Sequence, residues 1–344
     1  MTTGGESHGP GLTAILQGMP AGLSVDFEVL EREMARRMHG YGRGNRMKIE
    51  SDAVEVRGGV RGGETLGSPV VLWIENRDYK NWVPMMDPKK TVPHRVEQRR
   101  VHLPRPGHAD LSGGLKYLRR DLRDVLERAS ARETAARVAA GAFARMLLSR
   151  FGVEIKSGVR SLGPLGQDAP VPTWQDLQAV DDTSPLRAID RALEPEMVEL
   201  VDRAKEEGET LGGAVTVVAH GVPAGLGSHV QWDEKLDGRL AQAVMSVPAV
   251  KAVEIGAGIT ASRGLGSEAH DWIERTSEGL WHRPTNRAGG SEGGITNGED
   301  VVITAYKKPI ATLRKGLPSV DLDNLEPRTS QYERSDVTAL PAAG

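Results

Sequence analysis

Cysteine is absent from all 344 residues, which excludes disulfides, thiolate metal sites and cysteine nucleophiles together. Aromatic residues are also scarce, at 4% of the chain. No apolar run approaches the length of a membrane span, and no signal peptide precedes the first polar motif. We therefore expect a cytoplasmic protein, and we predict no metal site.

A large net charge is lacking too. The formal charge of -3 gives no general attraction to nucleic acid. Arginines nevertheless cluster locally, which favours a small anionic ligand over a polyanion. The clusters are Arg36, Arg37, Arg43 and Arg46, and then Arg99, Arg100 and Arg105. The 38% hydrophobic content is ample for a sizeable core, in one large domain or two.

Two general functions, phosphotransfer and RNA or anion binding, have only weak support from the sequence. A phosphotransferase is disfavoured because the chain has no GxxxxGK[ST] segment and no strand followed by GxGxxG. An anion-binding or RNA-binding protein could use the glycine-arginine loops as a basic surface, but few aromatic residues lie near those loops for base stacking. Strong weakening of binding by salt would distinguish RNA binding from binding of a small ligand.

Glycine-rich loops carry the chemistry of the first 46 residues. Residues 4–11 present Glu6, Ser7 and His8 among glycines, although a frayed terminus is the alternative. Residues 41–46 (YGRGNR) place two arginines on glycine-rich backbone, which lets guanidinium groups approach a phosphate or carboxylate closely. A flexible basic loop is equally compatible with this second segment.

The stretch from residue 105 to residue 141 concentrates polar residues around predicted helices. Pro106 and Gly107 predict a turn that places His108 on a loop beside Asp110. After residues 112–114 we expect a basic helix that ends near Arg128, and then a second helix with Ser130 as its N-cap. Such a helix start binds anions. Arg132 in its first turn opposes the helix dipole and needs a negative partner.

The other elements follow from periodicity and turn residues. Strands are predicted at 53–60, 69–75, 152–159 and 301–307. Helices are predicted at 27–38, capped by Asp26, and at 195–207. The proline-broken segment 76–101 has no clear period, and we interpret it as a long loop that could act as a lid.

Three motifs recur in the same order, which indicates an internal duplication. GMPAGL at residues 18–23 returns as GVPAGL at 221–226, and AVEV at 53–56 returns as AVEI at 252–255. The pattern GGxxGGxTxGxxVV occurs at 58–71 and again at 289–302. The second copy carries an insertion at roughly 261–288. We predict a pseudo-two-fold α+β architecture with two sheets.

Six motifs together resemble one family. They are GESHGPGL, GYGRGNRM, RPGHADLSGG, RASARETAARVAAG, GGSEGGITNGEDVV and RSDVTALPAAG, and they resemble chorismate synthase from about Thr3 to Gly344. The resemblance implies a single domain over residues 1–344, a β-α-β sandwich with repeat halves of roughly 1–150 and 205–344, and a homotetramer. The chain departs from the family's pattern by starting slightly short and by stopping at PAAG, where a C-terminal helix normally follows, and losing that helix would impair folding or assembly.

The family resemblance also implies a reaction. 5-Enolpyruvylshikimate 3-phosphate loses phosphate by 1,4-elimination to give chorismate, without net redox change. Reduced FMN is required, and in the family's accepted scheme it transiently gives an electron to the substrate. Because the chain has no separate NAD(P)H-binding fingerprint, we expect an external reductant, with NADPH as a possible upstream source.

Site roles are carried over from the family's motifs. His8 would protonate the departing phosphate, His108 would donate to the reduced flavin, and Asp336 would take the proton from flavin N5 with Ser7 as a relay. The substrate-binding arginines implied are Arg37, Arg43, Arg46, Arg105, Arg132 and Arg334. The FMN-binding positions implied are Ala129, Ser130, Ala131, Pro248, Ala249, Gly293, Lys308, Pro309, Ile310, Ala311, Thr312 and Arg334.

Overall fold

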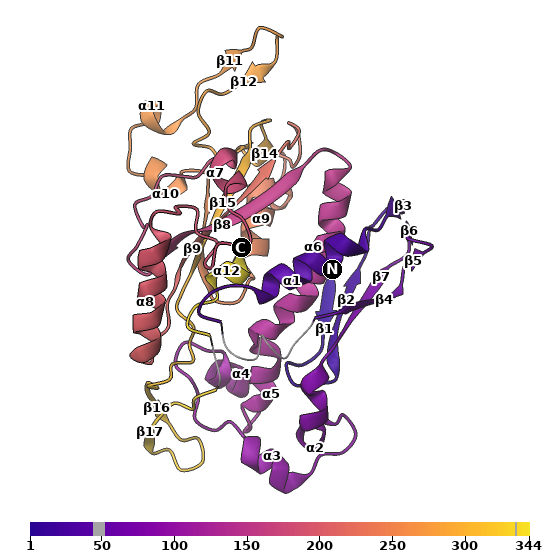
Figure 1. The fold of residues 1–344 in the computed structure, drawn as a ribbon, viewed down its shortest axis with the longest axis vertical. Coiled ribbons are helices and arrows are strands. Elements are labelled where there is room, and N and C mark those ends of the chain that lie inside the picture. Colours follow the sequence, from indigo (N-terminus) through magenta and orange to yellow (C-terminus); the bar gives the residue numbers. More distant parts are fainter. Residues whose placement is uncertain (44–51, 334–335) are drawn as a thin grey trace. The chain divides into compact units, whose positions relative to one another are not determined.

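The computed structural model describes residues 1–43, 52–333 and 336–344. The chain forms two compact units, and each is described by itself (Figure 1). Unit 1 comprises Met1–Leu147, Arg203–Thr210 and Ile310–Val337, and unit 2 comprises Leu148–Asp202, Leu211–Pro309 and Thr338–Gly344. Both units combine strands with helices, so the predicted α+β class is confirmed.

Unit 1 is built on a four-stranded antiparallel sheet. Its order is β1-β2-β7-β4, with β1 at Thr2–Gly4, β2 at Gly11–Leu16, β7 at Val70–Glu75 and β4 at Val54–Gly58. Alternate residues of β2 and β7 are buried, as the two-residue period of a strand with one covered face requires. The covered face packs against the helices α1 (Phe27–Met38) and α6 (Thr134–Ser149) (Figure 1).

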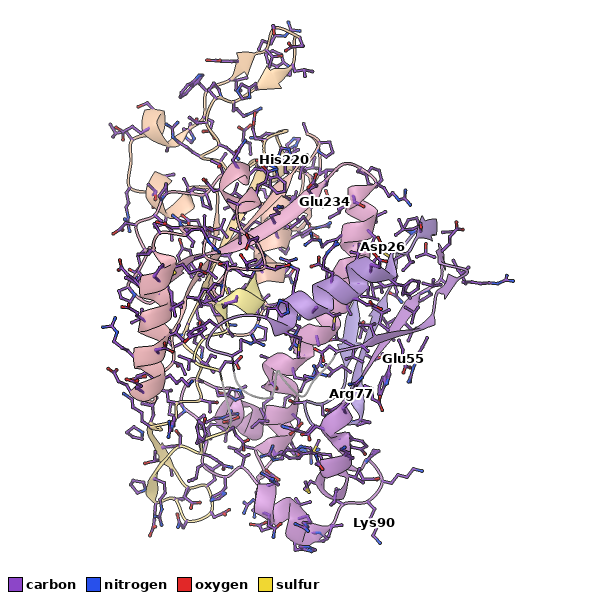
Figure 2. All side chains as sticks on the ribbon, viewed as in Figure 1. Asp26, Glu55, Arg77, Lys90, His220 and Glu234 are labelled. Carbon is purple, nitrogen blue, oxygen red and sulfur yellow. The ribbon has the colours of Figure 1, made fainter. Side chains whose placement is uncertain are left out.

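Different sequence features account for the two helices on this sheet. Asp26, labelled in Figure 2, accepts hydrogen bonds from the backbone N–H groups of Glu28 and Val29, so α1 has the predicted N-cap. Helix α6 instead buries a row of small residues, including Ala135, Ala136 and Ala139, beside the large ring of Phe143. Because alanine adds little volume, α6 lies close to the sheet and to α1.

The segment from residue 76 to residue 101 differs from the sequence expectation. It was expected to be a loop, but it contains a 3-10 helix η2 (Arg77–Asn81) and the helices α2 (Val83–Met86) and α3 (Pro93–Arg99). Both α2 and α3 have proline in the first turn. Proline there needs no N–H donor and fits the helical φ, so these prolines begin helices and do not break them.

The predicted basic helix before Arg128 is also corrected. Helix α4 (Asp110–Tyr117) already includes Ser112–Gly114, and it ends where Leu118 adopts a left-handed backbone, with φ of 53°. A second short helix, α5 (Arg123–Ala129), follows. Ser130 then caps a 3-10 turn, η3 (Ala131–Glu133), and α6 begins at Thr134. The predicted cap is therefore confirmed, but it caps the short 3-10 turn that precedes α6.

Unit 2 is built on a second four-stranded antiparallel sheet, with the order β10-β15-β9-β8. The strands are β8 (Glu154–Leu162), β9 (Gly213–His220), β10 (Val250–Ile255) and β15 (Val301–Lys307). Side chains of α7 (Trp174–Gln178) pack on one face with Val302, and those of α9 (Leu236–Met245) pack with Val301 and Ile303. Neighbouring residues of β15 are therefore buried on opposite faces.

The strand orders confirm the internal duplication. The first copy of the repeated motif follows β2, and the second copy follows β9; the AVEV and AVEI motifs lie on β4 and β10. Strands β1, β2, β7 and β4 thus correspond to β8, β9, β15 and β10, and both sheets list these strands in the same order. The sequence repeat is a repeat of topology.

The remaining elements complete the two units. They are β3 (Ala21–Ser24), β5 (Val60–Arg61), β6 (Glu64–Leu66), α8 (Glu194–Glu206), η4 (Trp232–Glu234), α10 (Gly258–Ala261), α11 (Gly266–Ala269), β11 (Glu274–Arg275), β12 (Trp281–His282), β13 (Ser291–Glu292), β14 (Ile295–Thr296), β16 (Pro318–Val320), β17 (Pro327–Thr329) and α12 (Leu340–Ala343). Among the described residues, no helix has both the length and the apolar character of a membrane span.

The small-residue face of α6 gives a stability prediction. Ala139→Leu adds volume at a position with 0% exposure, so we expect a loss of about 1–3 kcal/mol in the free energy of unfolding. Ala144→Leu lies on the exposed side of the same helix and should change it by less than about 0.5 kcal/mol. Urea unfolding of both variants checks the difference, and equal stabilities would show that α6 is not closely packed.

Candidate active site

The N-terminal glycine-rich loop is ordered and places His8 in the interior of unit 1. His8 Nδ1 lies 2.8 Å from Glu127 Oε1, and the His8 backbone N–H donates to Glu127 Oε2 at 2.7 Å. The Ser7 backbone N–H donates to the carbonyl oxygen of Glu127 at 2.9 Å. Asn76 Nδ2 donates to the Gly9 carbonyl oxygen at 2.8 Å. The loop is therefore anchored to α5 and to the end of β7, and the frayed-terminus alternative is wrong.

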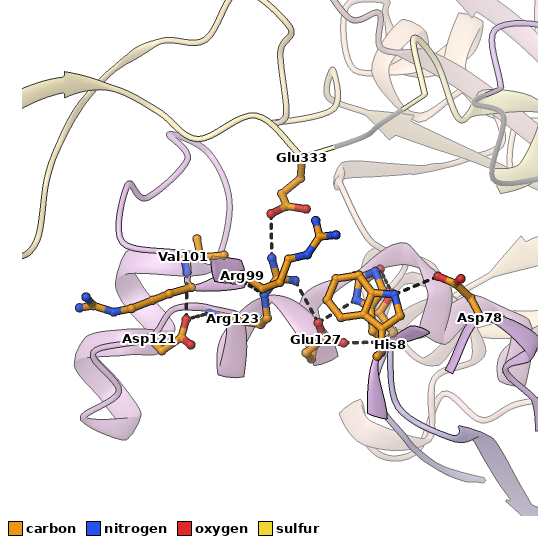
Figure 3. A network of polar contacts seen from close by, with 12 residues as sticks. His8, Asp78, Arg99, Val101, Asp121, Arg123, Glu127 and Glu333 are labelled. Carbon is orange, nitrogen blue, oxygen red and sulfur yellow. Dashed lines mark hydrogen bonds and ion pairs between the residues drawn. The ribbon is translucent and has the colours of Figure 1, made fainter. Parts of the chain in front are cut away.

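An aromatic ring covers His8. The Trp82 and His8 ring centroids are 3.8 Å apart, with an angle of 33° between the planes, and Trp82 Nε1 donates to Asp78 at 2.9 Å. Figure 3 shows His8 beside Glu127 and Arg123. The Arg123 guanidinium lies 5.2 Å from the Trp82 ring centroid, which is within cation–π range. It also pairs with Glu127 at 3.3 Å and with Glu333 at 2.9 Å.

The Glu127 carboxyl group is ionised in this setting. Burial raises its pKa, but the hydrogen bonds and charge of His8, with a contribution from the Arg123 charge, outweigh burial and lower the pKa overall. Glu127 is therefore an anion held against the imidazole, and its side chain is 3% exposed.

His108 occupies a second pair of the same kind. Its Nδ1 lies 2.6 Å from Asp110 Oδ1, and the Asp110 side chain is fully buried. Arg105 donates to Asp110 from Nε at 2.8 Å and from Nη2 at 2.9 Å. Because the carboxylate requires the proton on His108 Nδ1, the 3.1 Å contact of Arg105 with that nitrogen is a packing contact and not a hydrogen bond.

Burial raises the pKa of Asp110, but hydrogen bonds from His108 and Arg105 outweigh it and hold the pKa well below its usual range. Arg105 Nη1 also donates to Thr312 Oγ1 at 2.8 Å. This bond brings a predicted substrate residue, Arg105, together with a predicted FMN residue, Thr312.

The negative partner expected for Arg132 is Asp52. Arg132 Nη1 donates to Asp52 Oδ1, and Arg37 Nη1 donates to Asp52 Oδ2 at 2.9 Å. The Asp52 side chain is 1% exposed. Arg37 Nη2 also reaches the Ala131 carbonyl oxygen at 3.3 Å. Two predicted substrate arginines thus share one buried carboxylate next to the start of α6.

Other predicted site residues of unit 1 also meet one another. Ser130 Oγ donates to Ser7 Oγ at 3.1 Å, which ties the start of η3 to the His8 loop. Arg43 Nε lies 3.2 Å from Asp336 Oδ2, so the predicted base has an arginine beside it. Arg46 and Arg334 were predicted as well, and both lie outside the described residues.

Two of the FMN positions predicted in unit 2 meet at one end of its sheet. The Lys308 backbone N–H donates to the Ala249 carbonyl oxygen at 3.0 Å, which joins two of these positions. Burial, together with the Lys251 charge, lowers the pKa of Lys308. Gly293 adopts φ of 62°, and nothing lies within 4 Å of where its Cβ would be. Pro248 and Pro309 flank these residues in sequence, whereas Ile310, Ala311 and Thr312 belong to unit 1.

Glu127 also lines a cleft of about 520 Å³. Its lining contains three carboxylates and one arginine: Glu6, Met86, Tyr117, Arg119, Asp124, Val125 and Glu127. Burial and the Asp121 charge raise the pKa of Asp124, as is expected where carboxyl groups lie close together. A ligand with several negative charges would be repelled here. The arginine-lined part of unit 1 is therefore the candidate active site, and this cleft is not.

The sequence analysis missed four residues that contribute to the site. Glu127, Asp52, Trp82 and Arg123 hold predicted site residues, yet none was assigned a role. Glu127 is 119 positions from His8, and Asp52 is 80 positions from Arg132, so no local spacing could have revealed these pairs. The one usable signal was the unmatched charge of Arg132, which predicted that an acid exists without saying which one.

Comparison with known proteins agrees with this geometry. The sequence model of the chorismate synthase family matches residues 1–344. The chain belongs to the chorismate synthase family. It is 54% identical over 342 residues to chorismate synthases of Moorella thermoacetica and Thermus thermophilus, covering 99% of this chain and 88% of each relative. A chorismate synthase crystal structure is similar with a TM-score of 0.75 and 43% identity, covering 90% of this chain and 84% of the other.

Membership in this family establishes the reaction. The chain is a lyase of the shikimate pathway that converts 5-enolpyruvylshikimate 3-phosphate to chorismate by 1,4-elimination of phosphate, in aromatic amino acid biosynthesis. The fold is the chorismate synthase fold. The family assignment does not support the RNA-binding alternative. Residues 44–46 of the glycine-arginine loop on which that alternative rested lie outside the described residues.

The Asp110 pair predicts a pH-dependent stability. Asp110→Asn leaves Arg105 and His108 without their anion, so we expect unfolding to become easier by about 3–5 kcal/mol at pH 7. Since the folded-state pKa of Asp110 is lowered, its contribution is complete above the unfolded value of about 3.9 and is lost as pH falls through the folded value. The difference between variant and wild type should therefore narrow below about pH 4.

Urea unfolding at several pH values measures this difference. Asp124→Asn is the matched control, because the Asp124 side chain is exposed and its pKa is raised, and it should change stability by less than about 0.5 kcal/mol. An Asp110→Asn protein as stable as the control at pH 7 would contradict the account of the buried pair.

Proposed function

We propose that the elimination takes place in the arginine-lined part of unit 1 with reduced FMN as cofactor, and that His8, His108 and Asp336 handle the protons. One observation carries the proposal: two histidines, each bound through Nδ1 to a buried carboxylate, lie in a unit that also buries three of the predicted substrate arginines. Reduced FMN, when bound, supplies the transient electron donation that makes the carbon–oxygen bond easy to break.

Elimination breaks a C–H bond and a C–O bond at the two ends of an allylic unit. In the net reaction the electron pair of the C–O bond leaves with phosphate, the ring hydrogen is lost as a proton that Asp336 finally accepts, and the electron pair of the C–H bond forms the new double bond. His8 serves as the acid that gives a proton to the departing phosphate oxygen, since imidazole titrates near neutrality. Its Nδ1 faces Glu127, so Nε2 is the nitrogen that transfers the proton.

The arginines bind the substrate's phosphate and two carboxylates. Arg37 and Arg132 share Asp52, and Arg105 is held by Asp110. A guanidinium has five N–H donors, so each arginine can keep its internal carboxylate and still contact a substrate oxygen. The internal acids fix the direction of the donors before substrate arrives, which lowers the ordering cost of binding. Arg43, Arg46 and Arg334 complete the proposed lining.

His108 and Asp336 are proposed to act beside the flavin. His108, with its proton held on Nδ1 by Asp110, donates from Nε2 when protonated and offsets the negative charge of the reduced ring. Asp336 accepts a proton at its carboxylate, and its neighbour Arg43 keeps that carboxylate in place. Ser7 is proposed as a relay, and Ser130 orients its hydroxyl.

The residues present suit a flavin phosphate. Burial and a second cation, Lys251, lower the pKa of Lys308, and a bound dianion would offset both effects. Gly293 leaves its backbone open to a close approach. We therefore propose that FMN is held by Lys308–Thr312, Ala129–Ala131, Pro248, Ala249 and Gly293, with Arg334. An external reductant supplied ultimately by NADPH, a homotetramer of single-domain chains and a cytoplasmic location complete the proposal.

Histidine variants test the proposal. His8→Ala and His108→Ala should fold as the wild type does and lower turnover by about 10²–10⁴-fold, the usual contribution of general acid–base catalysis. The assay is anaerobic, with photoreduced FMN and substrate, and follows chorismate and phosphate. His94→Ala is the matched control, because His94 lies on the exposed helix α3. Wild-type rates in both site variants would rule out the proposed roles.

A further inference from the structure

Glu127 makes more contacts with the His8 loop than a simple ion pair would. Its carboxylate accepts from both the His8 ring and the His8 backbone, and its own carbonyl oxygen accepts from the Ser7 backbone N–H. Figure 3 shows Glu127 between His8 and Arg123. One residue of α5 thus fixes both the backbone position and the ring orientation of His8.

A carboxylate at Nδ1 determines how the imidazole carries its protons. The ionised Glu127 accepts hydrogen bonds only, so the neutral ring must keep its proton on Nδ1. The proton that the imidazolium loses first is then the one on Nε2. The negative charge also stabilises the imidazolium, which is the form that can act as an acid.

Other charged groups around this pair come from several elements. Arg123 of α5 lies 3.3 Å from Glu127 and partly neutralises its charge. Arg123 also forms an ion pair with Glu333. Arg99 of α3 faces Trp82 at 5.3 Å. Glu6, Arg119 and Asp124 line the cleft beside Glu127. Glu127 contacts the His8 ring directly through Nδ1.

We infer that Glu127 is the positioning residue of the phosphate-protonating histidine: it fixes the imidazole ring and holds the Nδ1–H form of His8, so that Nε2 is the nitrogen that gives up its proton. The inference depends on the role of His8 proposed above. In the elimination the Nε2 proton of the imidazolium moves to the phosphate oxygen and the C–O electron pair leaves with phosphate. His8 becomes neutral and keeps its Nδ1 proton, which stays hydrogen-bonded to the Glu127 carboxylate. His8 takes a new Nε2 proton from water afterwards.

Trp82 supports the same arrangement from the ring face. The stacked indole restricts rotation of the imidazole, and Asp78 fixes the indole through Nε1. The imidazole of His8 is therefore held at its edge by Glu127 and at its face by Trp82. These two contacts together restrict rotation about the side-chain bonds of His8.

The test is the pH profile of kcat for Glu127→Gln and Glu127→Asp in the whole protein with reduced FMN. In Glu127→Gln the anion is lost, so the alkaline limb should move to lower pH by at least about one unit, as removal of a neighbouring charge does. The value of kcat at neutral pH should fall at least about tenfold, with little change in KM. Glu127→Asp keeps the charge and should restore the limb while kcat stays reduced.

Glu33→Gln is the matched control, since Glu33 is also buried and paired with arginines but lies on α1. Its alkaline limb should coincide with that of the wild type. An unmoved limb in Glu127→Gln would overturn the inference. If His8→Ala turns over at the wild-type rate, the proposed role of His8 fails instead, so the two failures are distinguishable.

A second measurement does not depend on turnover. The ¹⁵N NMR spectrum of histidine-labelled protein, at a pH where the His8 ring is neutral, reports which nitrogen carries the proton. The His8 signals, assigned by their absence in His8→Ala, should show the Nδ1–H form. A predominant Nε2–H form would overturn the inference, because Nδ1 would then face the carboxylate without a proton.

Discussion

The burial of guanidinium groups is the constraint on which this structure depends. Arg37, Arg105, Arg123 and Arg132 have between 5% and 8% of their surface exposed, and a buried cation is tolerated only beside an anion. Asp52, Asp110 and Glu127 supply those anions. Each acid takes part in positioning an arginine or a histidine, so the internal carboxylates shape the site as much as the cations do.

The same arrangement occurs twice. In one case Arg123, Glu127 and His8 form a row, and in the other Arg105, Asp110 and His108 do. In both, the arginine competes for the carboxylate while the carboxylate holds Nδ1 of the histidine. The two sites differ in what covers the ring, since Trp82 stacks on the His8 ring. Two imidazoles with the same hydrogen-bond arrangement at Nδ1 can thus have different roles because their surroundings differ.

The sequence predicted what local rules determine. The Asp26 cap, strand β15 and the duplication follow from short-range patterns, and the structure confirms them. The segment 76–101 was missed because Pro84 and Pro93 suggest breaks, whereas the fold uses them to start helices. Glu127 and Asp52 were missed because tertiary folding alone brings them to His8 and Arg132. The family motifs predicted the reacting groups but not the acids that hold them.

The most direct measurement is an anaerobic crystal structure of the protein with reduced FMN and 5-enolpyruvylshikimate 3-phosphate. Our account predicts the substrate phosphate within hydrogen-bonding distance of His8 Nε2, with Arg37, Arg105 and Arg132 still bound to Asp52 and Asp110 while their other N–H groups contact the substrate. A phosphate bound away from His8, or arginines that leave their carboxylates to reach it, would contradict the account.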